Sequence, residues 1–186
     1  MSARLGERVF ITPSGAIKGE LTPLDISVMS VEGQHLQGPP PRSEHRLHLQ
    51  LYFQRPYAGA VVHAHPVHAT AYTLFGGWPE DLSFYPEALA QLGPVAVVPF
   101  GMPGTGALPE SVRPYAKDHK AFLLQNHGAV TIGTDLVDAA NRMESLERVA
   151  QILASARDRK TIPLPAEDAQ VLIERYGHGR LDGEPA

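Results

Sequence analysis

Cysteine is absent from this chain of 186 residues. Disulfide bonds, thiolate nucleophiles and thiolate metal sites are therefore excluded, which leaves histidine and carboxylate side chains as the ligands available to a transition metal. The sequence holds nine histidines. A histidine-based metal site is consequently the first kind of functional site to consider.

The chain also lacks long apolar runs, a signal-peptide pattern and a basic stripe. No run of about 18 apolar residues is present, and the opening MSARLGERVF has neither the apolar region nor the cleavage pattern of a signal peptide. Acidic and basic residues are interspersed at a net charge of −4, unlike a surface that neutralises a phosphate backbone. We therefore expect a cytoplasmic protein that binds neither nucleic acid nor membrane.

Apolar residues make up 43% of the chain, which is long enough for one substantial core and too short for two ordinary domains. Strand and helix patterns alternate loosely, without a βαβ rhythm or a Gly-rich phosphate fingerprint, so a nucleotide-binding Rossmann domain fits poorly. The expected strands lie in residues 8–12, 26–33, 59–65, 94–100 and 121–133, the last range forming two strands around a turn at Asn126 and Gly128. The expected helices cover residues 43–54, 69–76, 134–158 and 166–177, with Ser43 as the first N-cap.

Three histidines follow an apolar run in AVVHAHPVHATA, residues 60–71. Since alternate residues of a strand share a face, His63 and His65 project together, either as metal ligands or as polar residues where a strand leaves the core. His127 follows another apolar strand, and Glu44 lies at a helix N-terminus. Three imidazoles and one carboxylate make a tetrahedral zinc set.

His48 lies one helical turn after Glu44, and His68 lies three residues after His65. Both are expected beside the site or on helix surfaces rather than as ligands.

Five segments in this order resemble the class II aldolase/adducin superfamily and, within it, the zinc-dependent L-fuculose-1-phosphate aldolases. They are ITPSG at 11–15, SEHRLH at 43–48, VVHAHPVH at 61–68, PGT at 103–105 and LLQNHG at 123–128. The resemblance covers residues 1–160. It implies a three-layer αβα fold with a mainly antiparallel sheet flanked by helices, assembled as a fourfold tetramer with active sites between subunits.

The resemblance implies that Glu44, His63, His65 and His127 bind the metal, zinc or another divalent ion. In similar aldolases the glutamate is also the catalytic base, and a tyrosine from a neighbouring subunit, matched here by Tyr85, protonates the aldehyde oxygen. A tyrosine at this position could instead be an aromatic packed at an oligomer contact. The divalent ion acts as a Lewis acid that stabilises the enediolate left when a carbon–carbon bond breaks.

For the substrate phosphate, the resemblance points to Ser14, Gly15 and Ser43. Related sequences commonly have two serines before the glutamate, whereas this one has Arg42 and Ser43. Arg42 could hold a phosphate bidentately, or it could favour a carboxylated substrate. The substrate therefore stays open at this point.

Three functions remain as hypotheses. The first is an aldehyde-lyase that cleaves a ketose 1-phosphate, such as L-fuculose 1-phosphate, to dihydroxyacetone phosphate and an aldehyde. The second is a decarboxylase of a 3-oxo sugar-acid phosphate, and the third is a non-catalytic, adducin-like oligomeric module. Glutamate at position 44, rather than aspartate, argues against a pentose-phosphate epimerase of the same superfamily, and the intact ligand set argues against the adducin-like module.

The domain organisation is expected to be a class II aldolase-like domain over residues 1–160 and a C-terminal helical segment and tail over residues 161–186. Similar aldolases have a first helix and a GNxS loop before ITPSG, and MSAR resembles the end of that loop. The chain is either a short variant or one begun at an internal methionine, and we favour the latter. Either way, an exposed apolar groove and weak binding of phosphorylated substrate are expected, with the metal site still formed.

Overall fold

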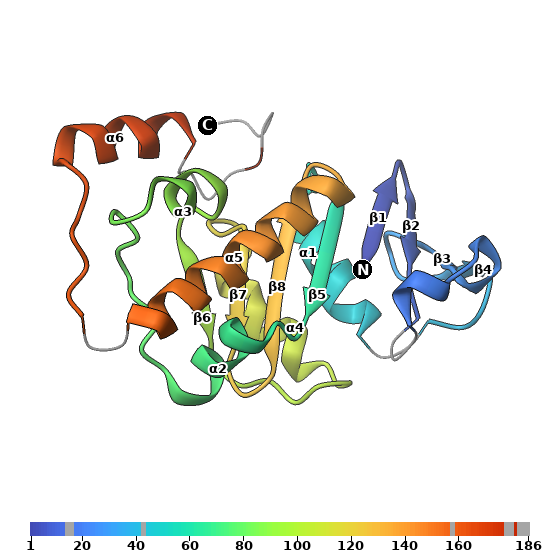
Figure 1. Ribbon diagram of the computed structural model, residues 1–186. Helices are drawn as coiled ribbons and strands as arrows, with labels where there is room; N and C mark the ends of the chain where they lie inside the picture. The colour runs from blue at the N-terminus through green and yellow to red at the C-terminus, as the bar shows by residue number, and fades with distance from the viewer. Residues whose placement is uncertain (14–16, 42–43, 157–158, 177–180, 182–186) are drawn as a thin grey trace.

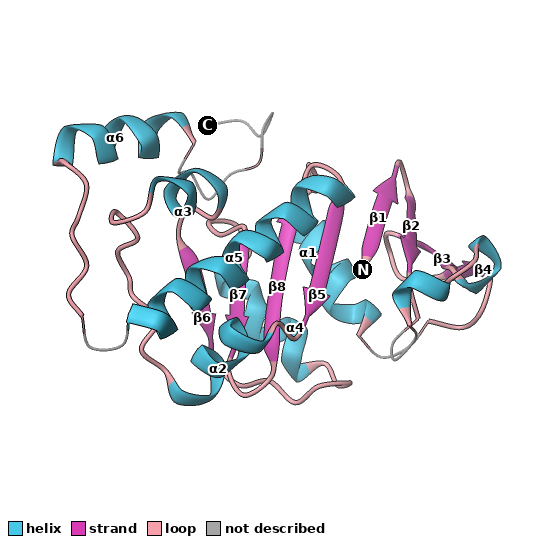
Figure 2. Cartoon of the chain, viewed as in Figure 1, coloured by secondary structure: helices cyan, strands magenta, loops and turns pink. Residues whose placement is uncertain are grey.

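The computed structural model describes residues 1–13, 17–41, 44–156, 159–176 and 181. Eight strands form one mixed sheet in the order β4-β3-β2-β1-β5-β8-β7-β6 (Figures 1 and 2). Among these strands only β6 and β7 pair in parallel, and every other neighbouring pair is antiparallel. The strands are β1 Ser2–Leu5, β2 Arg8–Ile11, β3 Ser27–Ser30, β4 His35–Gln37, β5 Ala60–Ala64, β6 Val95–Val98, β7 Ala121–Leu124 and β8 Gly128–Gly133.

Six α-helices accompany the sheet in the described part of the chain. They are α1 His45–Gln54, α2 Val67–Phe75, α3 Pro86–Gln91, α4 Ala107–Val112, α5 Leu136–Ala156 and α6 Ala166–Arg175. Short 3-10 helices cover Lys18–Glu20, Pro23–Asp25 and Arg113–Tyr115. None of the helices described is long and apolar enough to cross a membrane.

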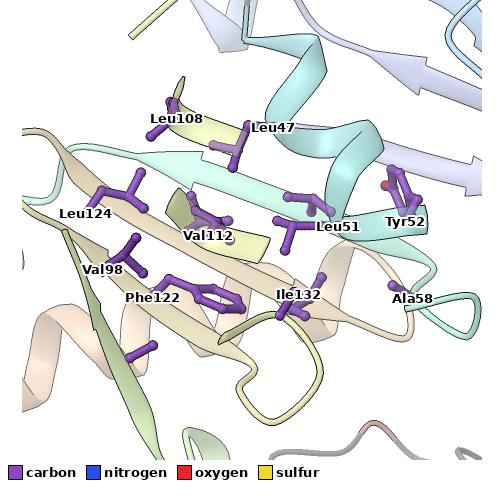
Figure 3. Close-up of a cluster of buried hydrophobic side chains, with 14 of the residues drawn as sticks. Leu47, Leu51, Tyr52, Ala58, Val98, Leu108, Val112, Phe122, Leu124 and Ile132 are labelled. Carbon is purple, nitrogen blue, oxygen red and sulfur yellow. The ribbon is translucent and has the colours of Figure 1, made fainter. Parts of the chain in front are cut away.

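The central strands bury a different set of side chains on each face, because successive residues of a strand point to opposite sides. Phe122 and Leu124 of β7 pack with helices α1 and α4 (Figure 3), whereas Ala121 and Leu123 of the same strand pack with α2, α3 and α5. Helices therefore cover both faces of the sheet at its centre. The sheet is mostly antiparallel, as expected, and the helices on its two faces are roughly consistent with the expected αβα layers.

The two faces of the N-terminal half of the sheet differ in how they are covered by helices. Val9 of β2 lies in the cluster beneath α1, but on the opposite face a cavity of about 630 Å³ opens beside β1, β2 and β3. Its lining includes Met1, Ala3, Phe10 and Leu24. Apolar side chains thus line an open cavity next to the first strand.

Several short elements do not appear in the sequence-based expectation. Strands β1 and β4 and helices α3 and α4 are only three to six residues long, too short to show a repeated apolar period. Helix α1 begins at His45, with Glu44 at the N-cap position and no side-chain cap. The N-cap expected at Ser43 is therefore wrong by one residue, while Ser43 itself lies outside the described residues.

Candidate metal centre

Strand pairing brings the three histidines to one edge of the sheet. In the antiparallel pair β5 and β8, His63 lies opposite Val130 and Ala64 opposite Ala129, so β5 ends where β8 begins. His127 lies in the turn between β7 and β8, immediately before Gly128. The preceding residue, Asn126, has a φ of 57°, a left-handed conformation that asparagine tolerates better than most residues. The expected turn is confirmed, and it brings His127 to the end of β5.

The three imidazoles form a compact cluster. Ring centroids are 4.9 Å apart for His63 and His65, 4.8 Å for His63 and His127, and 5.1 Å for His65 and His127. One potential ligand nitrogen from each ring lies within 4.8 Å of the others. His63 is buried, His127 is half-buried and His65 is exposed, so the cluster opens to solvent on one side.

Two ring nitrogens in the cluster are buried without a hydrogen-bond partner among the described residues. They are Nε2 of His63 and Nδ1 of His127. The other nitrogen of His63, Nδ1, lies 2.9 Å from the carbonyl oxygen of Ala129 and donates to it, because a carbonyl oxygen can only accept. That hydrogen bond leaves Nε2 with a free lone pair, as in many metal-binding histidines. The donor set therefore fits a divalent metal ion.

The electrostatics of the cluster also favour neutral imidazoles. Burial lowers the pKa of His63 to about 4, and burial also lowers the pKa of His127. The negative charge of Glu44 opposes both shifts without reversing them. Near neutral pH these rings thus have the deprotonated form that metal binding requires.

Gly128 makes room for the exposed histidine. A Cβ atom at this position would lie 2.3 Å from Cδ2 of His65 and 2.7 Å from the carbonyl oxygen of Ala64. Ordinary contacts of this kind are 3.4–4 Å. Only glycine therefore allows the imidazole of His65 to pack against the start of β8.

Helix α2 starts directly after the HAHP segment and is held by Glu147 of α5. The Glu147 carboxylate accepts hydrogen bonds from the backbone N–H groups of His68 and Ala69, at 3.0 and 2.8 Å, and from Nδ1 of His68 at 2.8 Å. Burial raises the pKa of Glu147, but these hydrogen bonds outweigh burial and lower it overall. The carboxylate satisfies donors of the first helical turn and fixes the chain just beyond His65. His68 thus hydrogen-bonds to Glu147 and is not one of the three clustered histidines, and its expected position is likewise outside the ligand set.

Glu44 stands at the N-terminal end of α1, near the histidines but outside the group whose ligand atoms lie within 4.8 Å. Its charge nevertheless influences the pKa of His63 and of His127. His48, one turn further along α1, is only 2% exposed and hydrogen-bonds to Ser2. The buried position of His48 was not evident from the sequence, in which a helix-surface position fits equally well.

Tyr85 lies at the start of α3, away from the histidines. It lines a cavity of about 390 Å³ together with Asn141, Ser145 and Arg148 of α5, and none of the three histidines lines that cavity. Within one chain Tyr85 therefore does not join the cluster. The expected phosphate ligands Ser14, Gly15, Arg42 and Ser43 lie outside the described residues.

Comparison with known proteins identifies the class to which this site and fold belong. The sequence profile described as "Class II Aldolase and Adducin N-terminal domain" matches residues 1–154. A 3-oxo-tetronate 4-phosphate decarboxylase from Pectobacterium atrosepticum is 37% identical over 160 residues, which cover 84% of this chain and 73% of the relative. An L-fuculose phosphate aldolase from Methanococcus maripaludis is 34% identical over 152 residues, which cover 82% of each chain.

The fold is similar to that of a solved relative as well. YgbL from Escherichia coli superimposes with a TM-score of 0.86 at 34% identity, covering 92% of this chain and 85% of that one. This chain is a member of the class II aldolase and adducin family. The class II aldolases are metal dependent, and the three-histidine cluster could hold that metal.

Proposed function

We propose that this protein is a metal-dependent lyase that breaks a carbon–carbon bond in a phosphorylated sugar or sugar acid. The observation that carries the proposal is the histidine cluster itself: three imidazoles whose ligand atoms lie close together, two of which, His63 and His127, have a lowered pKa and a buried nitrogen without a described partner. An oligomeric module without catalytic activity has no need of such a cluster. The lyase names of the relatives support the same reading.

His63, His65 and His127 would hold a divalent ion, with zinc as our first candidate and Glu44 as a fourth ligand. Such an ion supplies a Lewis acid for the oxygen next to the bond that breaks. Glu44 would also transfer the proton, because a carboxylate beside the cluster can reach a bound substrate. The exposed side of His65 is where the substrate would enter.

The particular reaction we propose first is decarboxylation of a 3-oxo sugar-acid phosphate. In that reaction the bond to the carboxylate carbon breaks, CO₂ leaves, and the electron pair remains on the carbon beside the 3-oxo group, which then takes a proton. A decarboxylase of this type is 37% identical to the chain, and Arg42 at a position commonly held by serine suits a substrate with an additional carboxylate. Glu44 would relay this proton from water to the carbon.

Aldol cleavage of a ketose 1-phosphate, the first hypothesis from the sequence, is the second candidate. It is supported by the 34% identity to an L-fuculose phosphate aldolase over 82% of both chains. In this reaction Glu44 would act as a base, and a separate acid is needed for the aldehyde oxygen. Tyr85 would be that acid only if it reached a neighbouring subunit's site, since it lies away from its own.

The proposal has two further parts. The first is a homotetramer with active sites between subunits. The second is a phosphate pocket formed by Ser14, Gly15, Arg42 and Ser43. Sedimentation of the metal-loaded protein tests the assembly, and a fully active monomer would exclude it. Binding of inorganic phosphate by wild type and by Arg42→Ala tests the pocket. Equal affinity of the two proteins would remove Arg42 from it.

Product analysis tests the reaction. Purified Zn²⁺-loaded protein is incubated separately with 3-oxo-tetronate 4-phosphate and with L-fuculose 1-phosphate, and CO₂ and dihydroxyacetone phosphate are measured. CO₂ release from the first substrate alone supports the decarboxylase, and dihydroxyacetone phosphate from the second alone supports the aldolase. Failure of the purified protein to take up Zn²⁺, together with the formation of neither product, would refute the lyase.

A further inference from the structure

Three polar side chains are buried together between α1 and β1. Ser2 and His48 are each 2% exposed and Tyr52 is 1% exposed. The Ser2 hydroxyl lies 2.8 Å from Nδ1 of His48 and 2.8 Å from the hydroxyl of Tyr52. Apolar side chains lie beside them, since Leu47 and Leu51 belong to the cluster that packs α1 on the sheet (Figure 3). A fully buried hydrogen-bonded chain in such an interface specifies one arrangement of its members.

The network connects the two elements that carry Glu44 and His63. His48 and Tyr52 follow Glu44 by one and two helical turns, so all three side chains lie along one face of α1. Ser2 of β1 pairs with Val61 of β5, and His63 is two residues further along the same face of β5. The Ser2 hydroxyl therefore ties the helix of Glu44 to the strand of His63.

Apolar packing alone fixes a helix less strictly along its axis than a hydrogen-bonded chain does. A shift of α1 by one turn would move Glu44 by about 5.4 Å, away from the histidines. Such a shift would also separate His48 and Tyr52 from Ser2 and leave buried polar atoms unpaired. The network thus opposes the motions that would displace Glu44.

We propose that Ser2, through His48 and Tyr52, is a positioning residue that sets the place of Glu44 relative to His63 and His127. The proposal deepens the proposed function, because it rests on Glu44 acting at that metal site. Ser2 itself does not touch the ligands. Its effect on the metal passes through the carboxylate at the start of α1.

The test measures Co²⁺ binding and the visible spectrum of bound Co²⁺ in four proteins: wild type, Ser2→Ala, Glu44→Ala and the double variant. Ser2→Ala is expected to weaken Co²⁺ binding about 10-fold and to shift the spectrum toward that of Glu44→Ala. In the Glu44→Ala background, Ser2→Ala is expected to change affinity by less than about two-fold, because the residue through which it acts is gone. A Ser2→Ala effect of equal size in both backgrounds, or no effect in either, would overturn the proposal.

A matched control separates positioning from general loss of stability. Thr131 is fully buried and donates to the carbonyl oxygen of Ala139 at 2.7 Å, remote from α1. Thr131→Val should lower the melting temperature comparably while leaving Co²⁺ affinity and spectrum unchanged. If it alters the Co²⁺ spectrum as Ser2→Ala does, the positioning role is refuted.

Tyr52→Phe gives a second route if Ser2→Ala does not fold, because it keeps the ring in the apolar cluster. The same spectral shift is expected from it, and an unchanged spectrum would count against the network. Failure of the proposed function is distinguishable. If the wild-type protein binds no Co²⁺, the metal site and this proposal are refuted together. If the wild-type protein binds Co²⁺ and Ser2→Ala changes neither the affinity nor the spectrum, only the positioning role is refuted.

Discussion

Replacing Gly128 by alanine is expected to remove His65 from the metal site while leaving its side chain intact. The added Cβ would lie 2.3 Å from Cδ2 and 3.3 Å from Cγ of that imidazole. To restore an ordinary contact of 3.4 Å, the ring has to move by about 1 Å. Metal–ligand distances tolerate only about 0.2 Å. The displaced ring can therefore no longer serve as a ligand.

The stability cost follows from the same geometry. The new Cβ would also lie 2.7 Å from the carbonyl oxygen of Ala64, a backbone atom in the β5–β8 pair that cannot rotate away. Overpacking of this kind costs about 2 kcal/mol, which lowers the melting temperature of a chain of this length by about 4–8 °C. We expect a folded protein that binds Zn²⁺ about 100-fold more weakly than wild type.

Zinc titration and thermal unfolding measure both effects. Gly106→Ala is the matched control, since a Cβ there meets no atom within 4 Å and the residue has an ordinary φ of −68°. If Gly128→Ala acts only by displacing His65, it should add little to the loss of affinity caused by His65→Ala. Zinc binding by Gly128→Ala as tight as that of wild type would refute the argument from contact distances.

Three further outcomes follow from the site. Glu44→Gln should keep most of the metal by elemental analysis yet lower kcat by about 10²–10⁴-fold, and a near-wild-type rate would exclude Glu44 from proton transfer. Because the folded-state pKa of Glu147 is lowered, its carboxylate stabilises the fold above pH 4.5, and this stabilisation is lost as the pH falls below that value. The melting-temperature difference between wild type and Glu147→Gln, measured with chelator present, should accordingly shrink between pH 6 and pH 3.5, and a constant difference would contradict the assigned role of the charge. Dialysis against a chelator should lower the melting temperature, and Zn²⁺ at about 1,000 times its dissociation constant should restore about 4 kcal/mol of stability, whereas an unchanged transition would argue against metal binding.

The sequence predicts the long elements and the histidine cluster because both have strong local signals. Helix α5 shows a repeated apolar stripe over 21 residues, and the buried strands β5, β7 and β8 consist mostly of apolar residues. The spacing of His63 and His65 predicts a shared strand face; β5 ends at Ala64, one residue before His65, but the two rings still lie 4.9 Å apart. Strand pairing then explains how His127 joins them. The ligand candidates were therefore recognisable before the pairing was known.

Other features depend on contacts between distant parts of the chain. Ser2 pairs with Val61 and bonds to His48, and neither contact leaves a pattern within the first five residues. Glu147 looks like one more charged residue on α5 until α2 is placed against it. Likewise, the close approach of Gly128 to His65 appears only when β5 and β8 are paired. Local periodicity carries no information about such contacts.

The distribution of the histidines along the chain has a consequence for folding. Of the three clustered histidines, His63 and His65 precede His127 by about 60 residues. An ion held by all three therefore closes a long loop that contains α2, α3, β6, α4 and β7. This chain has no cysteine, and such a closure would restrict the unfolded chain as a disulfide bond does in other proteins. In the chain-entropy description, closing a loop of this length stabilises the folded state by about 4 kcal/mol. The ion would then act as a reversible cross-link, through which the supply of free metal governs how long the chain resists unfolding and proteolysis.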